Sequence, residues 1–127
     1  DNDLRQDIPD MMEKIIKGIC EGNNAEYEFN YGYGSPATIN EEESTATGMK
    51  VAKEIFGEEN ILPKVPTMSA EDFAKYLMEF PGCVMLLGAI TDESLAPAHN
   101  SKFMIDESAM KYGAEYFVRY ALEYAKE

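Results

Sequence analysis

The chain has 127 residues, 45% of them hydrophobic, which suits one domain with a core of its own or one domain plus part of another. Its 24 acidic and 11 basic residues leave a formal net charge of −13. This argues against nucleic acid or an anionic membrane as a partner, since both attract Lys and Arg. No run is long enough to cross a membrane, and the acidic composition fits a cytoplasmic protein.

The two cysteines, Cys20 and Cys83, form no close motif. A disulfide framework or a thiolate zinc site is therefore not expected. The first residue is Asp1 rather than Met, so we expect the sequence to be a piece of a longer protein.

A helix is predicted over residues 8–21, with Asp7 as a candidate N-cap and Pro9 in the first turn. Gly22 and the two asparagines after it favour its end, because both residue types accept positive φ. The apolar residues that fall on one face of this helix are Ile8, Met12, Ile15, Ile16 and Ile19.

Residues 25–33 alternate between two faces, which predicts a half-buried strand of an antiparallel sheet. An aromatic face can also stack nucleic-acid bases. Nothing basic accompanies this one, so a core face is the favoured interpretation. The face carries Ala25, Tyr27, Phe29, Tyr31 and Tyr33.

A break at residues 34–38 precedes a second region. There Asn40 is the expected N-cap of a helix, with Glu43 in a capping box and Gly57 as the stop. Residues 60–65 predict a short strand, and Pro63 favours an edge position for it.

The rest of the chain predicts a further helix, a buried strand and a last helix. Ser69 and Asp72 are expected to cap the first of these helices, and residues 83–90 are apolar enough for a strand covered on both faces. Asp106 is the expected cap of the last helix. The residues expected to point inward from it are Met110, Gly113, Ala114, Phe117, Val118, Ala121 and Tyr124.

His99 is the only histidine of the chain and lies in the loop between the predicted buried strand and Asp106. Sites of α/β proteins lie beyond the carboxyl ends of their strands, and imidazole is the commonest side-chain metal ligand. A loop histidine without a function fits the same position. Position and uniqueness alone leave these two interpretations open.

Several motifs in order resemble the C-terminal part of the aminoacylase-like metal-dependent amidohydrolases, the family of hippurate hydrolase, N-acetyl-diaminopimelate deacetylase and the auxin-conjugate hydrolases. The resemblance covers essentially the whole chain, and the order and spacing of the motifs are specific although each is weak alone. The residues that carry it are Tyr33 to Asn40, Met68 to Phe73, Tyr76, Pro81 to Cys83, Leu87, Gly88, His99, Phe103, Asp106 and Glu107.

The resemblance implies an α/β fold, an αβα-sandwich catalytic-domain segment preceded by the end of a ferredoxin-like α+β lid domain. Residues 1–37 would be the remnant of the lid, or dimerisation, domain, and residues 38–127 the C-terminal segment of the catalytic domain. Such enzymes use two divalent metal ions, Zn or Mn, to activate a water that hydrolyses the amide bond of an N-acyl amino acid. A homodimer is also implied.

The resemblance makes His99 a metal ligand and places the general base and the other ligands upstream of residue 1. One histidine cannot hold two metals, so the piece alone is expected to bind no metal and to be inactive. Three departures from the family pattern are Ala70 for Gly, Ala98 for a second His, and the apolar pair Met104 and Ile105. None of them removes the expected ligand.

Glu71, Asp72 and Gly88 are candidates for the substrate pocket. A pair of adjacent carboxylates suggests acid–base chemistry. However, a capping role explains Asp72, and the family that the chain resembles does not use this pair as its general base. A structural role, or support of the wall of the site, is therefore favoured for Glu71 and Asp72. Gly88 either lets the backbone approach the substrate or is only a turn glycine. The alternative to an enzyme is a non-catalytic binding module or a degenerate relative; the histidine at the motif position favours the enzyme.

Overall fold

The computed structural model describes residues 1–90, 96 and 98–126. The chain divides into two compact units. Unit 1 consists of Asp1–Ile39 and Thr67–Phe80, and unit 2 of Asn40–Pro66 and Pro81–Glu127. The assignment of residues 1–37 to a lid domain and 38–127 to a catalytic domain stays a prediction. In the described part of the chain no helix combines the length and the apolar character that crossing a bilayer requires.

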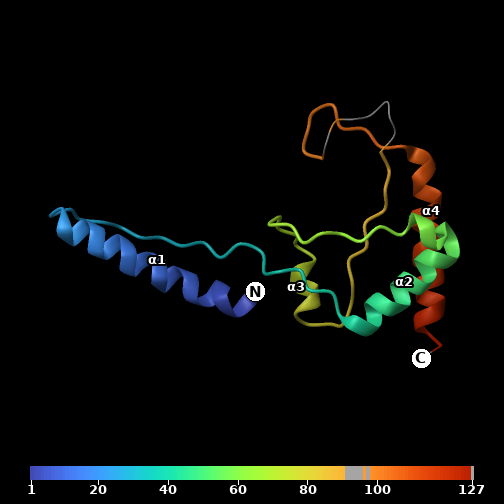
Figure 1. Cartoon of the computed structure of the whole chain (residues 1–127), viewed down its shortest axis with the longest axis horizontal. Helices are drawn as coiled ribbons and strands as arrows, with labels where there is room; N and C mark the ends of the chain where they lie inside the picture. The colour runs from blue at the N-terminus through green and yellow to red at the C-terminus, as the bar shows by residue number, and fades with distance from the viewer. Residues whose placement is uncertain (91–95, 97, 127) are drawn as a thin grey trace. The chain divides into compact units, whose positions relative to one another are not determined.

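Unit 1 contains the longest helix, α1 (Asn2–Gly22) (Figure 1). It begins earlier than predicted, because the Asp1 carboxylate accepts hydrogen bonds from the backbone N–H groups of Asp3 and Leu4 at 2.8 and 3.1 Å. The prediction that Asp7 is the cap is therefore wrong, and Pro9 lies buried inside the helix rather than in its first turn. The predicted end at Gly22 is confirmed.

After α1 the chain runs back beside the helix as residues 25–33 (Figure 1). Neither these residues nor 83–90 are helical, and the described part of the chain holds no strand. The segment 60–65 begins inside the short helix η1 (Glu58–Asn60). A strand exists only when it pairs with a neighbour. The αβα sandwich and the lid sheet accordingly stay predictions.

The helix α3 (Ala74–Leu77) of unit 1 is one turn long and has no side-chain cap. The capping box predicted from Ser69 and Asp72 is therefore wrong. Both side chains have other partners: the Ser69 hydroxyl lies 2.8 Å from that of Thr67, and Asp72 accepts a hydrogen bond from Ser35.

Unit 2 is built on two helices that pack side by side, α2 (Glu42–Phe56) and α4 (Met110–Tyr124) (Figure 1). The short helix η2 (Glu107–Ala109) leads into α4, and Asp106 caps it as predicted by accepting from Ser108 N at 2.9 Å. Gly57 ends α2 with φ of 82°, also as predicted. The buried residues of α2 recur at helical spacing and are Ser44, Thr47, Gly48, Val51 and Ala52.

The cap of α2 is Glu41 and not Asn40. The Glu41 carboxylate accepts from the N–H groups of Ser44 and Glu43 at 2.6 and 2.9 Å, and these hydrogen bonds lower the pKa of Glu41. Asn40 cannot act as the cap because its carboxamide binds the backbone of Val84.

The inward face predicted for α4 is largely wrong. Phe117 and Val118 are 73% and 61% exposed. The half-buried residues are instead Gly113, Tyr116, Tyr120 and Glu123, and of these only Gly113 was predicted. Small residues of α2 set this face, because a Cβ at Gly48 would lie only 2.7 Å from the Tyr116 hydroxyl.

Candidate functional site

His99, in unit 2, adopts a left-handed backbone conformation with φ of 66°. This conformation is uncommon for residues other than Gly, and histidine is among the side chains enriched there. The residues that follow hold the turn: Lys102 N donates to the Asn100 carboxamide oxygen and Phe103 N to the Asn100 carbonyl, both at 2.9 Å. The His99 side chain is exposed, and we find no hydrogen-bond partner for it among the described residues.

A hydrogen bond joins the two ends of the segment that carries His99, and we call this junction the base of the segment. The N–H of Asp106 donates to the carbonyl of Ala89 at 2.8 Å, which joins the end of the apolar run to the start of η2. The Ser108 hydroxyl and N–H hold the pKa of Asp106 below its usual value, because both donate to the carboxylate. The ends of the segment are therefore fixed, and His99 lies between them in sequence.

The residues described in the structure contain no group of three His, Cys, Asp or Glu side chains placed to hold a metal ion. His99 alone supplies one exposed nitrogen donor. A metal site needs several such donors in a fixed arrangement. His99 thus fits the role of one ligand, while these residues by themselves do not form a metal centre.

Gly88 of unit 2 is exposed, and a Cβ added there would meet no atom within 4 Å. Packing within the described residues therefore does not require a glycine at this position. Its predicted closeness to a substrate stays a prediction.

Glu71 and Asp72 belong to unit 1 and are both exposed. Glu71 folds onto its own backbone, where its carboxylate accepts from Phe73 N at 3.2 Å. Asp72 accepts from the Ser35 hydroxyl at 2.8 Å. Each carboxylate has a structural partner, and the two do not share a proton-transfer arrangement with one another.

The segment around Ser35 is held from α1 as well. The Asn2 carboxamide oxygen accepts from Ala37 N at 2.8 Å. The Arg5 guanidinium donates to the Gly34 carbonyl and lies 5.0 Å from the centre of the Tyr33 ring. The stretch from residue 33 to 37 is therefore tied to both α1 and the residues before α3.

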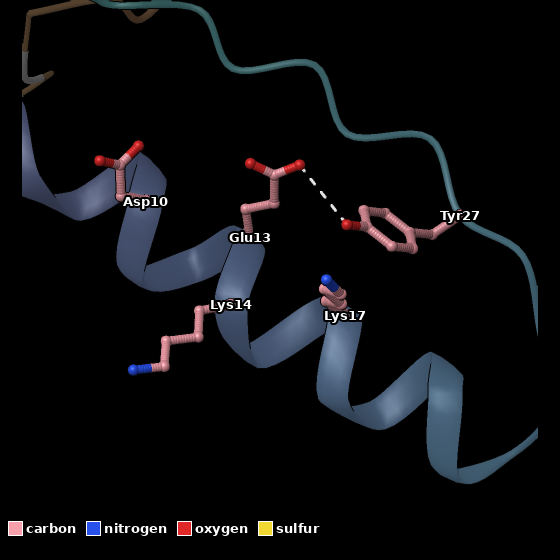
Figure 2. Close-up of a pocket in the computed structure, with 5 residues that line it drawn as sticks. All are labelled: Asp10, Glu13, Lys14, Lys17 and Tyr27. Atoms are coloured by element: carbon pink, nitrogen blue, oxygen red, sulfur yellow. Dashed lines mark hydrogen bonds between the residues drawn. The ribbon is translucent and has the colours of Figure 1, made fainter.

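Unit 1 also has an open hollow between α1 and the chain that runs back beside it (Figure 2). The Tyr27 hydroxyl donates to Glu13 across it at 3.5 Å. Partial desolvation, followed by the nearby Glu13 carboxylate, raises the pKa of Tyr27. Besides Tyr27, two acidic and two basic side chains line the hollow, namely Asp10, Glu13, Lys14 and Lys17. Because their charges balance, the hollow has no net preference for a charged ligand.

A polar cluster between α2 and α4 was not predicted. The Cys83 thiol donates to the Ser44 carbonyl at 3.3 Å, and the rings of Tyr116 and Tyr120 stack with centroids 6.1 Å apart. Burial, with the nearby Cys83 and Tyr120, raises the pKa of Tyr116 to about 12. The sequence feature that could have predicted this face of α4 is a tyrosine at every fourth position. Residues at this spacing lie on one side of a helix, and here they are Tyr112, Tyr116, Tyr120 and Tyr124.

Comparison with known proteins identifies the family. Residues 6–123 match the model of the peptidase family M20/M25/M40. Hippurate hydrolase of Campylobacter jejuni is 32% identical over 127 residues, which are 99% of this chain and 32% of that protein. Thermostable carboxypeptidase 1 of Saccharolobus solfataricus is 32% identical over 117 residues, 90% of this chain and 29% of that protein.

A third relative, N-acetyldiaminopimelate deacetylase of Brevibacillus brevis, is 28% identical over 113 residues, 89% of this chain and 29% of that protein. The chain thus spans about a third of the length of the curated relatives it matches. No solved structure matches it significantly. The family match covers most of the chain and includes His99, Glu71 and Asp72, and the resemblance seen in the motifs is confirmed: the chain belongs to the peptidase family M20/M25/M40.

Proposed function

We propose that the chain is the C-terminal part of a metal-dependent amidohydrolase that cleaves the amide bond of N-acyl amino acids or related conjugates. The observation that carries the proposal is His99, the only histidine, exposed on a left-handed turn inside the residues that match the family. Relatives named hippurate hydrolase, N-acetyldiaminopimelate deacetylase and IAA-amino acid hydrolase support the class of substrate.

In this proposal His99 supplies one neutral nitrogen ligand. Two divalent ions, Zn or Mn, would polarise the substrate carbonyl and lower the pKa of a bound water. The remaining ligands and the general base would come from the part of the relatives' length that this chain does not span. The closed base at Ala89 and Asp106 supports the role of His99, because a ligand must be held in place to contribute affinity.

Glu71, Asp72 and Gly88 are proposed to lie in the wall of the substrate pocket, and Asp72 to act there through Ser35 rather than as an acid or base. The hydrogen bond between Ser35 and Asp72 supports this division of roles. The intact enzyme is proposed to be a homodimer.

The test uses the intact protein that carries this chain and a panel of N-acetyl and N-benzoyl amino acids. We expect hydrolysis that a chelator abolishes and that added Zn²⁺ or Mn²⁺ restores. Hydrolysis that survives complete removal of metal would contradict the proposed chemistry. Absence of hydrolysis across the panel, in a protein that still binds N-acyl amino acids, would favour the non-catalytic binding module instead.

A further inference from the structure

The Asn40 side chain binds the backbone of Val84 in both directions. Its Nδ2 donates to the Val84 carbonyl at 3.0 Å, and the Val84 N–H donates to its Oδ1 at 2.9 Å. Beside this pair, the Glu41 N–H donates to the Gly82 carbonyl at 2.9 Å. One carboxamide therefore satisfies both backbone groups of a residue 44 positions away, as a neighbouring strand would.

This pairing sets which side chains of the following run face the helices. Three residues at a spacing of two make those contacts. The Cys83 thiol donates to the Ser44 carbonyl, Met85 Cε lies beside Gly48, and Leu87 Cδ2 beside Gly113. Successive side chains of an extended chain point to opposite sides, so a slip of one residue would turn all three away. Asn40 therefore fixes the N-terminal end of this run.

The same run ends at the base of the His99 segment. Ala89 lies two residues after Leu87, and its carbonyl accepts from Asp106 N at 2.8 Å. The position of this carbonyl depends on the register of the run, because the backbone from Val84 to Ala89 is continuous and the side chains of Met85 and Leu87 contact α2 and α4. The register therefore also determines where the segment that carries His99 is closed.

We propose that Asn40 is a positioning residue for His99. By fixing Val84, Asn40 sets the register of residues 82–89. This register determines the position of the hydrogen bond between Ala89 and Asp106, which holds His99 in place to bind a metal. The metal-binding part of this inference rests on the proposed function above. A purely structural Asn40 would contribute stability without changing metal affinity, and the two roles are separable by experiment.

The experiment compares three variants in the intact protein. Asn40→Ala removes both hydrogen bonds to Val84, whereas Asn40→Asp keeps the acceptor for the Val84 N–H and loses only the donor. The matched control is Asn60→Ala, because Asn60 Nδ2 donates to the Phe56 carbonyl at 2.7 Å in the same unit but has no hydrogen bond to the run. Amide hydrogen exchange at Val84 and Asp106, Zn²⁺ affinity by chelator competition, and Tm are measured for each.

We expect Asn40→Ala to speed exchange at both Val84 and Asp106 and to weaken Zn²⁺ binding roughly tenfold, the low end of the cost of removing groups that orient a ligand. Asn40→Asp should fall between Asn40→Ala and the wild type, and it keeps the test decisive if Asn40→Ala does not fold. Asn60→Ala should change Tm only.

A Tm for Asn40→Ala as low as that of Asn60→Ala, with wild-type exchange at Asp106 and wild-type Zn²⁺ affinity, would overturn the positioning role. Failure of the proposed function looks different, because the wild-type protein itself would then take up no metal. The exchange at Asp106 would still decide in that case whether Asn40 sets the base of the segment.

Discussion

The Ser35 hydroxyl donates a hydrogen bond of 2.8 Å to Asp72 Oδ1, across 37 positions of sequence. It joins the stretch after residues 25–33 to the residues before α3, and it gives Asp72, one of the two adjacent carboxylates of the motif, a hydrogen-bond partner within unit 1. This relationship makes Asp72 a structural hydrogen-bond acceptor.

Asp72→Asn should keep near-normal kcat in the intact enzyme, because the amide oxygen still accepts from Ser35. Asp72→Ala should lower the free energy of unfolding by about 1 kcal/mol, the usual net value of one such hydrogen bond. Steady-state kinetics and denaturant unfolding measure the two effects. A loss of kcat by several orders of magnitude in Asp72→Asn, with unchanged stability, would show that Asp72 acts as an acid or base.

Gly48→Ala should destabilise the protein by about 1 kcal/mol through overpacking. The added Cβ would lie 2.7 Å from the Tyr116 hydroxyl, 2.9 Å from Met85 Cε and 3.3 Å from Cys83 Sγ. The matched control is Gly18→Ala in α1, where no atom lies within 4 Å of the new Cβ. That substitution should stabilise by up to about 1 kcal/mol, the difference in helix propensity.

The same site offers a second check by denaturant unfolding. Tyr116→Phe removes the hydroxyl nearest to the new Cβ, so Gly48→Ala should cost less in that background than in the wild type. Equal gains in stability for Gly48→Ala and Gly18→Ala would show that Tyr116 is not packed against Gly48.

Cys83 should react with iodoacetamide more slowly than Cys20. Burial raises the pKa of the Cys83 thiol, and its sulfur donates to the Ser44 carbonyl at 3.3 Å. Alkylation proceeds through the thiolate, which both effects disfavour. The rates are measured at neutral pH on Cys20→Ser and Cys83→Ser, each of which leaves one of the two thiols of this chain. Faster labelling of Cys83 would mean that the polar cluster between α2 and α4 is open to solvent.

Glu123 should contribute to stability near neutral pH and lose that contribution in acid. Hydrogen bonds from Lys126 and Lys50 lower its pKa from 4.5 to about 2. A carboxylate with a lowered pKa in the folded state stabilises the fold above the unfolded pKa, and this is lost as pH falls through the folded pKa. Glu123→Gln should therefore lower Tm at pH 7, and the difference from the wild type should shrink between pH 4.5 and about 2.

Salt gives the control for this ion pair. The Glu123 side chain is 20% exposed and that of Lys50 is 58% exposed, so added salt should weaken the attraction at neutral pH. A Tm difference that is independent of pH and salt would show that Glu123 acts through packing and not through its charge.

Local pattern predicted the features of this chain that neighbours in sequence determine. Gly57 ends α2 and Asp106 caps η2, the short helix that leads into α4, because a positive φ and a cap act within a few residues. Asn40 looked like a cap for the same reason. Its partner is Val84, 44 positions away, and no local pattern contains that information.

The covered face of α4 was mispredicted for a related physical reason. Apolar periodicity selects Phe117 and Val118, on the assumption that the most apolar face is the buried one. The face that packs is set instead by small residues on α2, where Gly48 admits Tyr116. The motif containing His99 identified the family from sequence alone, whereas the backbone conformation of His99 and the closure of its segment required the structure.

If His99 is a metal ligand, the zinc content of the intact protein with His99→Ala will show it, with Asn60→Ala as the control. His99→Ala should lose bound zinc and most hydrolysis of N-acyl amino acids, while its Tm without metal matches that of the wild type. Asn60→Ala should retain its zinc, because Asn60 Nδ2 donates to the Phe56 carbonyl and Asn60 lies outside the segment that carries His99. Full zinc content and normal turnover in His99→Ala would show that His99 is not a metal ligand.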